Sequence, residues 1–292
     1  MKRLPLIIAS LLLCLSVLTA GADSLLLPLY DAATDLLFHS ENVTVTASVT
    51  CSLDGAFFKE AAVTHSQSGM DFYRDVYLTT PREDGSLRES GYTILSLDGQ
   101  TTALRSYPPY VLDYDREDER VCILRHSVGV DNLVRLCRSV AELTESSLPE
   151  GAVTSEQEGA VVISLAGETT PGTVNTLLTN LLLYYGYATK GITYDDMALT
   201  AWGDVYDYTT VAEGILYCVS DAELASLNAS IRLDESGRMS VVTGVAELAI
   251  FTRGGNTHSL KVDFSLEATD WGSTALPASS DLYSSRWWRE EE

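Results

Sequence analysis

The sequence lacks the motifs that mark the common classes of hydrolase and nucleotide-binding enzyme. It contains no G-x-S-x-G, no H-E-x-x-H, no phosphate-binding loop and no S-x-x-K. Histidine is scarce, and its four copies lie far apart in the chain: His39, His65, His126 and His258. A catalytic triad can assemble from distant residues, so an exported hydrolase stays open as the least favoured function. We expect a protein that is not an enzyme and has no catalytic residues.

Basic residues are also few. The chain has 19 lysines and arginines against 41 aspartates and glutamates, which gives a net charge of −22. Such a charge repels nucleic acid and anionic membrane surfaces, so we expect no nucleic-acid partner. Hydrophobic residues make up 46% of the sequence, which is ample material for a core. The composition therefore predicts a folded acidic protein.

Only one long apolar run occurs, and it lies at the N-terminus. Two of the first three residues are basic, and the apolar run that follows ends at the small residues Ala20-Gly21-Ala22. This order predicts a cleavable signal peptide over residues 1–22. The run is at the lower limit for crossing a bilayer, so an uncleaved membrane anchor is the alternative. Leu13 precedes Cys14, which argues against lipid attachment there. We expect an exported protein of the cell envelope or a secreted one.

None of the five cysteines forms a C-x-x-C pair, which excludes the common redox motif and zinc ribbons. Four cysteines lie beyond the signal: Cys51, Cys122, Cys137 and Cys218. An even number in an exported chain permits disulfides. Cys51, however, lies on the apolar side of a predicted strand and fits a buried thiol equally well. Both alternatives stay open.

The acidic segment Asp113–Glu119 carries carboxylates at alternate positions, as calcium loops do. An EF-hand loop needs glycine at its sixth position and glutamate at its twelfth, where this segment has Asp118 and Leu124. A solvated charged loop is the favoured interpretation. We expect no metal and no cofactor.

Strict alternation of apolar and polar residues is the clearest pattern in the sequence. From Val43 to Leu53 every odd position is apolar and every even position is Thr or Ser, which predicts a strand with one buried face. Asp54-Gly55 predicts a two-residue hairpin turn. Four more predicted strands complete a five-stranded meander: Ala56–His65, Met70–Thr79, Gly91–Leu97 and Gln100–Tyr107.

Two segments in the middle of the chain have helical spacing. One begins at Asp131, a residue type favoured as an N-cap. The other begins near Pro171 and is apolar on most sides as far as Tyr187. Strands are predicted between and after these helices: Ala160–Leu165, Leu227–Leu233, Met239–Phe251 and Leu260–Thr269.

These elements predict an α+β, mainly β fold, with one domain over residues 23–275 and a flexible acidic tail at 276–292. A large antiparallel sheet curls, and its apolar side must be covered, so we expect a half-barrel of about nine to eleven strands. Two or three helices would cover its concave apolar face.

The order of signal peptide, early meander, mid-chain helices and long closing strands resembles the LolA/RseB-like group of extracytoplasmic lipoprotein carriers and envelope-stress sensors. The segment 42–59 looks like the first hairpin of that group, and Leu233–Arg238 looks like a late hairpin turn. The chain also resembles exported proteins of Gram-positive gut bacteria. The resemblance covers most of residues 30–270 and implies a half-barrel whose helices form a lid over a lipid-sized cavity. The chain departs from the group in lacking an acylated cysteine, and no functional residue is carried across.

We expect a non-enzymatic binding protein that holds a hydrophobic ligand, such as a lipid, an acyl chain or a lipidated segment, between sheet and helices. The alternative function is an envelope sensor or interaction protein that regulates a membrane-protein partner. The same side chains can instead pack into a closed core, because both arrangements bury the same apolar area. The candidate lining residues are Phe72, Val76, Leu178, Leu181, Leu182, Tyr185, Val262, Phe264 and Leu266.

Overall fold

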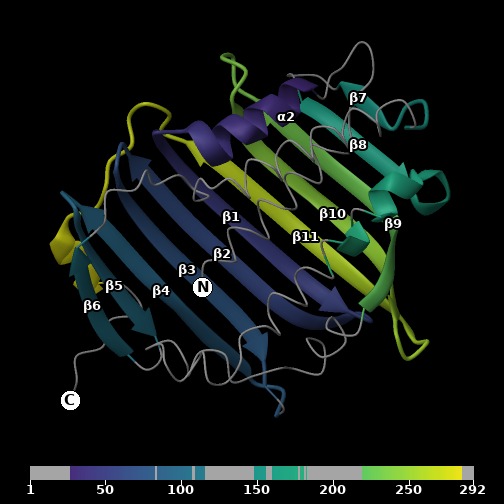
Figure 1. Cartoon of the computed structure of the whole chain (residues 1–292), viewed down its shortest axis with the longest axis horizontal. Coiled ribbons are helices and arrows are strands. Elements are labelled where there is room, and N and C mark those ends of the chain that lie inside the picture. Colours follow the sequence, from purple (N-terminus) through teal and green to yellow (C-terminus); the bar gives the residue numbers. More distant parts are fainter. Residues whose placement is uncertain are drawn as a thin grey trace.

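The computed structural model describes residues 27–82, 84–106, 109–115, 148–155, 160–176, 178–180, 182 and 219–284. These residues form one curved antiparallel sheet of 11 strands in the order β6-β5-β4-β3-β2-β1-β11-β10-β9-β8-β7 (Figure 1). The strands are β1 (Asn42–Leu53), β2 (Ala56–Ser68), β3 (Asp71–Pro81), β4 (Leu87–Leu97), β5 (Gln100–Ser106), β6 (Pro109–Asp115), β7 (Val153–Ser155), β8 (Ala160–Ala166), β9 (Val219–Leu233), β10 (Met239–Thr252) and β11 (Thr257–Thr269). The prediction of a mainly β, antiparallel fold is confirmed.

The N-terminal half of the sheet is the predicted meander, β1 to β5. Asp54 and Gly55 have φ angles of 50° and 79°, which is the pair of positive values that a type I′ hairpin turn requires. Two strands were not predicted: β6, which pairs with β5 along its whole length, and the short β7. Asp113 and Asp115 therefore belong to a strand, and their assignment to a charged loop is wrong. Residues 116–119 of that segment lie outside the described residues.

The C-terminal strands join the sheet through β1. The register of β1 with β11 places Val49 opposite Phe264 and Cys51 opposite Val262. Strands β10, β9, β8 and β7 follow outward in that order. The predicted strands in this half are confirmed, and β9 is longer than expected because it begins at Val219. Segments from the two ends of the chain are therefore neighbours in the middle of the sheet.

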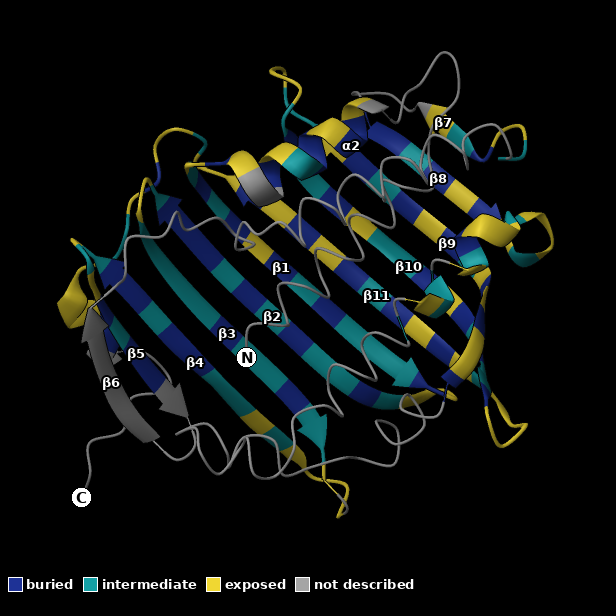
Figure 2. Ribbon diagram, viewed as in Figure 1, coloured by how far each residue is buried: buried dark blue, intermediate teal, exposed yellow. Residues whose placement is uncertain are grey.

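One face of the sheet is apolar, and the burial of side chains alternates along the strands accordingly (Figure 2). The buried positions in β11 are Leu260, Val262, Phe264, Leu266 and Ala268. Cross-strand pairing puts the odd positions of β1, the odd positions of β2 from residue 59 onward, and the even positions of β3 and β4 on this same side. We call this side the inner face.

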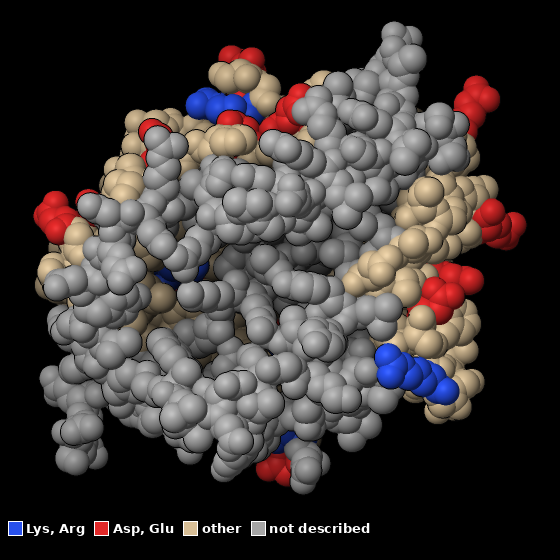
Figure 3. Space-filling model, in the orientation of Figure 1, with Lys and Arg blue, Asp and Glu red and all other residues tan. Residues whose placement is uncertain are grey.

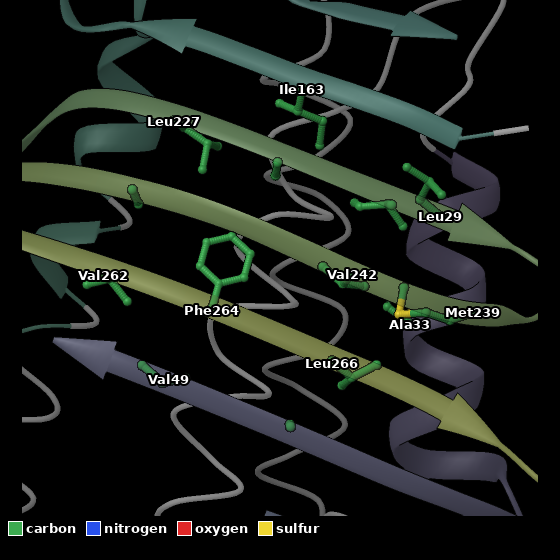
Figure 4. Close-up of a cluster of buried hydrophobic side chains, with 14 of the residues drawn as sticks. Leu29, Ala33, Val49, Ile163, Leu227, Met239, Val242, Val262, Phe264 and Leu266 are labelled. Carbon is green, nitrogen blue, oxygen red and sulfur yellow. The ribbon is translucent and has the colours of Figure 1, made fainter. Parts of the chain in front are cut away.

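Helical segments pack against one end of the inner face. The helix α2 (Leu27–Thr34) and the π-helical η1 (Asp35–His39) precede β1 and were not predicted. Leu29 and Ala33 of α2 lie beside Met239 of β10 (Figure 4), and all three are buried. None of the helices in the described part of the chain is long and apolar enough to cross a membrane.

The helix expected from Pro171 is present where the structure describes it. Residues 172–176 and 178–180 are helical, after a short 3-10 helix, η3 (Gly167–Thr169). Val174 is buried in the same core as the inner face. The helix predicted from Asp131 lies outside the described residues, as does the signal segment 1–22.

The opposite face of β4 and β5 is covered by a C-terminal segment, the 3-10 helix η5 (Ser279–Ser284). Its Leu282 is only 2% exposed and packs with Leu95 and Leu104. This segment lies within the predicted flexible tail, which begins at residue 276. Burial of one large apolar side chain stabilises the packed conformation. Residues 285–292 lie outside the described residues.

Candidate ligand-binding face

Rows of buried apolar side chains run across the inner face, perpendicular to the strands. The first row takes one residue from each strand from β4 through β1 and β11 to β8, and each residue is in register with the next. Its members are Tyr92, Val76, Val63, Ala47, Leu266, Val242, Ile231 and Val161, and all are buried. The hydroxyl of Tyr92 at the β4 end is the one polar group in this row, so the surface from β3 to β8 is continuously apolar.

Two parallel rows follow in the same way. One consists of Leu78, Ala61, Val49, Phe264, Gly244, Ala229, Ile163 and Val153. The other consists of Cys51, Val262, Ala246, Leu227 and Leu165. We call the three rows together the apolar rows.

The centre of the apolar rows is built from small side chains and one ring. Phe264 lies opposite Gly244 on β10, and its ring lies toward that strand (Figure 4). A β-carbon at Gly244 would run into this ring and would come within 2.7 Å of the carbonyl oxygen of Asn228. Ala229 and Ala246 are the neighbours of Gly244 on this face. Glycine is required here because the ring occupies the place of a side chain.

The structure brings most of the predicted lining residues together. Val76, Val262, Phe264 and Leu266 are buried in one cluster. Leu178 and Leu182 are half-buried and pack against the same cluster. Phe72 is half-buried on the inner face, at the border of a polar group described next. Leu181 and Tyr185 lie outside the described residues.

A polar cluster lies beside the apolar rows on strands β2 to β5. It consists of His65, Gln67, Arg74, Ser96 and Thr101. The Arg74 Nε–H donates to His65 Nδ1 at 3.3 Å. His65 Nε2 lies 3.3 Å from Gln67 Oε1, and Gln67 Nε2 donates to the Gly69 carbonyl at 3.2 Å. The side chains of His65 and Gln67 are 2% and 1% exposed, so this hydrogen-bonded chain is built into the interior.

The electrostatics of the cluster keep His65 neutral. Burial of the ring, with the positive charge of Arg74 beside it, lowers the pKa of His65 to about 3. Because Nδ1 accepts from Arg74, the ring proton lies on Nε2 and is donated to Gln67. The guanidinium of Arg74 carries a positive charge. Within the cluster, Arg74 therefore contributes the positive charge, and His65, Gln67, Ser96 and Thr101 are neutral.

The guanidinium of Arg74 also packs on an aromatic ring. It lies 5.7 Å from the centroid of Phe72, and the Phe72 and His65 rings are 5.8 Å apart. Among the described residues, no carboxylate forms an ion pair with Arg74, and the only hydrogen bond made by its guanidinium is the one from Nε to His65.

Sequence reasoning missed Arg74 and His65, although a signal for both was present. Arg74 lies between Phe72 and Val76, two residues that were predicted to line the site, and the period of two puts all three on one side of β3. His65 extends the odd positions Ala61 and Val63 of β2. A charged or titratable residue in phase with an apolar strand face is the pattern that identifies them.

The other histidines and Cys51 do not form an assembled catalytic group in the described residues. His258 Nδ1 lies 2.7 Å from Asp54 Oδ2, and this hydrogen bond lowers the pKa of Asp54. His39 precedes β1 and His258 pairs with the turn after it, so the two lie at opposite ends of that strand. Burial raises the pKa of Cys51, which is a free thiol, to about 11. His126 and the remaining cysteines lie outside the described residues.

In the described ranges, no group of three or more His, Cys, Asp or Glu side chains can hold a metal ion.

A groove of about 660 Å³ lies on the rim, between α2–η1 and the β9–β10 turn, with Asp31, Asp35 and Arg238 in its lining. Arg238 is engaged with Asp234 at 3.0 Å and with the Trp271 ring at 5.1 Å. Acidic side chains are spread around the periphery of the molecule in Figure 3.

No protein-family model matches the chain, and no curated protein matches it. Among solved structures, a β-barrel-like protein with a domain of unknown function (DUF1849) from Brucella abortus is 9% identical, with 79% of this chain and 100% of that chain covered and a TM-score of 0.20. An N-terminal dehydratase from the difficidin assembly line is 12% identical, with 82% of each chain covered and a TM-score of 0.13. A double-hotdog-fold protein from Mycobacterium tuberculosis is 11% identical, with 84% of this chain and 79% of that chain covered and a TM-score of 0.12. Similarity at this level carries no argument about function, which rests on the geometry of the inner face.

Proposed function

We propose that this chain is an extracytoplasmic binding protein, not an enzyme, that holds a hydrophobic ligand such as an acyl chain against the inner face of its sheet. The observation that carries the proposal is the first apolar row, which crosses the adjacent strands from β3 to β8 without a polar side chain. A ligand lying along such a row would bury apolar surface over its whole length, and that burial drives binding.

The finer architecture belongs to the same proposal. The sheet would be a half-barrel whose concave side is the inner face, with helices covering it as a lid. Two observations support this arrangement: α2 packs at one end of the inner face, and Leu178 and Leu182 from the helical segment pack against the same cluster. The arrangement is the one that the resemblance to LolA/RseB-like carriers implies. The predicted signal peptide would deliver the protein to the cell envelope or the exterior.

The small residues at the centre of the apolar rows favour a ligand over a closed core. A protein interior is packed to the density of an organic crystal, so large side chains must fill the space above a sheet when nothing else does. Ala229 and Ala246 instead make a low floor beside the Phe264 ring, which covers Gly244. Ligand sites are concave and mostly apolar, which fits such a floor.

The proposal is tested with purified protein that has been stripped of lipid. We expect saturable uptake of the fluorescent fatty acid cis-parinaric acid, and co-purifying lipid in native mass spectrometry before stripping. Ala229→Phe should abolish uptake, because a phenyl ring would occupy the space above the floor. Ala225→Phe is the matched control, since Ala225 is exposed on the same strand, and it should bind as the wild type does.

Far-UV circular dichroism confirms that both variants are folded. A wild-type protein that takes up no probe and carries no lipid would contradict the proposal. That result would favour the alternative function, an envelope sensor that acts on a membrane-protein partner through its surface.

A further inference from the structure

Arg74, which has no carboxylate partner among the described residues, identifies the chemistry of the ligand more closely. We propose that the guanidinium of Arg74 binds the carboxylate of a long-chain fatty acid whose acyl chain lies along the apolar rows. This inference rests on the proposed function, and it adds a head-group site and a ligand class to it.

The Arg74 guanidinium has N–H donors that the described residues do not use. Arginine carries five N–H donors in a rigid planar fork, and in Arg74 the Nε–H is the donor used by His65. The described residues supply neither a carboxylate nor a second acceptor for the remaining N–H groups. A half-buried positive charge is costly unless it is paired and hydrogen-bonded. An anionic ligand would complete this set of hydrogen bonds.

The Arg74 guanidinium is held in place by its neighbours. His65 is buried and neutral, and its ring nitrogen fixes the Nε edge of the fork, while Phe72 supports the face of the guanidinium from 5.7 Å. Gln67 holds the other side of the His65 ring. Arg74 is therefore preorganised, so little side-chain entropy is lost when a ligand binds.

The number of charged side chains in the polar cluster limits the charge of the ligand. The polar residues near Arg74 on this face, namely His65, Gln67, Ser96 and Thr101, carry no charge at neutral pH. One guanidinium matches one carboxylate, with which it forms paired N–H···O bonds. A phosphate monoester would bring more negative charge than this site balances. The single guanidinium therefore fits a fatty acid better than a ligand with a phosphomonoester head group.

The apolar surface next to Arg74 is long enough for an extended acyl chain. Val76 follows Arg74 by two residues on the same side of β3 and is a member of the first apolar row. From β3 to β9 this row crosses five inter-strand spacings, which amounts to roughly 24 Å. A head group at Arg74 would thus place an extended acyl chain across the strands, toward α2 and β9.

The test compares cis-parinaric acid with its methyl ester, which has the same chain and no charge, in fluorescence titrations at about pH 8, where the acid is ionised. The wild type should bind the acid about tenfold or more tightly than the ester, because a charge-assisted hydrogen bond is lost with the ester. Arg74→Gln should remove this preference and leave the affinity for the ester unchanged. Arg74→Lys, which keeps a charge without the fork, should retain part of the preference.

Arg253→Gln is the matched control, since Arg253 is exposed in the β10–β11 turn, and it should leave both affinities unchanged. An Arg74→Gln variant that still prefers the acid as the wild type does would overturn the inference. Equal affinity of the wild type for acid and ester would also overturn it, even if Arg74→Gln did not fold, and would leave the proposed function standing. Binding of neither probe would sink both.

Discussion

The apolar rows and the polar cluster lie side by side on one face of one sheet, and they follow opposite rules. The rows consist of hydrophobic residues. Apolar burial is non-directional and scales with area, so one apolar side chain can often replace another of similar size there. In the cluster each buried polar atom is tied to a named partner, as with His65 between Arg74 and Gln67. A buried polar group without a partner costs free energy. The rows therefore tolerate exchange of one apolar side chain for another, whereas the cluster requires particular hydrogen-bonding partners.

The largest expected effect breaks the apolar rows. Leu266→Ala should lower the free energy of unfolding by about 2 to 5 kcal/mol, because it removes buried methyl groups and leaves a cavity beside Ala47 and Val242. Urea denaturation measures this change. The control is Leu87→Ala, where the leucine is 57% exposed, and it should change the free energy by less than about 0.5 kcal/mol. Equal losses would show that the rows are not the stabilising element.

Overfilling the same rows should have a smaller effect. Gly244→Ala is expected to cost about 1 to 3 kcal/mol, because the new methyl group would displace the Phe264 ring and crowd the Asn228 carbonyl. The matched control is Gly254→Ala, where the nearest atom is 3.9 Å from the added carbon. Thermal unfolding of the two variants gives the comparison. A Gly244→Ala variant as stable as Gly254→Ala would mean that the ring moves freely.

The polar cluster should make the free energy of unfolding depend on pH. The pKa of His65 falls from 6.5 to about 3 on folding, so below pH 6.5 the unfolded chain binds a proton that the folded chain does not. Stability is therefore lost as pH falls from 6.5 toward 3, and His65 accounts for about 2 kcal/mol of this loss by pH 5.

Urea denaturation of wild type and His65→Leu over this pH range measures that contribution as the difference between their slopes. His39→Leu serves as the control for removing a histidine from the chain, because the His39 side chain is 60% exposed. Parallel curves for wild type and His65→Leu would contradict the neutral, buried state of His65.

The smallest effect separates stability from specificity within the cluster. Arg74→Met should cost about 1 kcal/mol, because it leaves His65 Nδ1 buried without a donor. The double variant His65→Leu/Arg74→Met removes both partners and should be closer to the wild type in urea denaturation. A double variant that is less stable than Arg74→Met would show that the pair holds the sheet together.

Much of the fold was predictable because its signals are local. The alternation in Val43–Leu53 and in Leu260–Thr269 identified strands β1 and β11, and Asp54-Gly55 identified the hairpin between β1 and β2. The strand β6 was missed because its charged residues hid the alternation. The helix α2 was missed because its segment directly follows the expected signal peptide and shows little apolar periodicity.

The candidate site was predicted in part. Val76, Val262, Phe264 and Leu266 were named because they continue apolar alternation, and they do lie in one cluster. Arg74 and His65 were not named, since a charged residue within a strand is ordinarily assigned to the solvent side. Their meeting depends on the register of β2 with β3, which places His65 opposite Arg74.

The sequence by itself determined nine of the eleven strands and the residues that share one side of each, because these depend on a period of two and on turn chemistry within a few residues. Only the tertiary structure decided that β1 pairs with β11, since that contact joins segments more than two hundred residues apart (Val49 with Phe264). The same pairing aligns residues of eight strands into one apolar row. Register across strands also decided that Arg74 and His65 meet inside the protein, because pairing, and not local pattern, sets which side chains face each other.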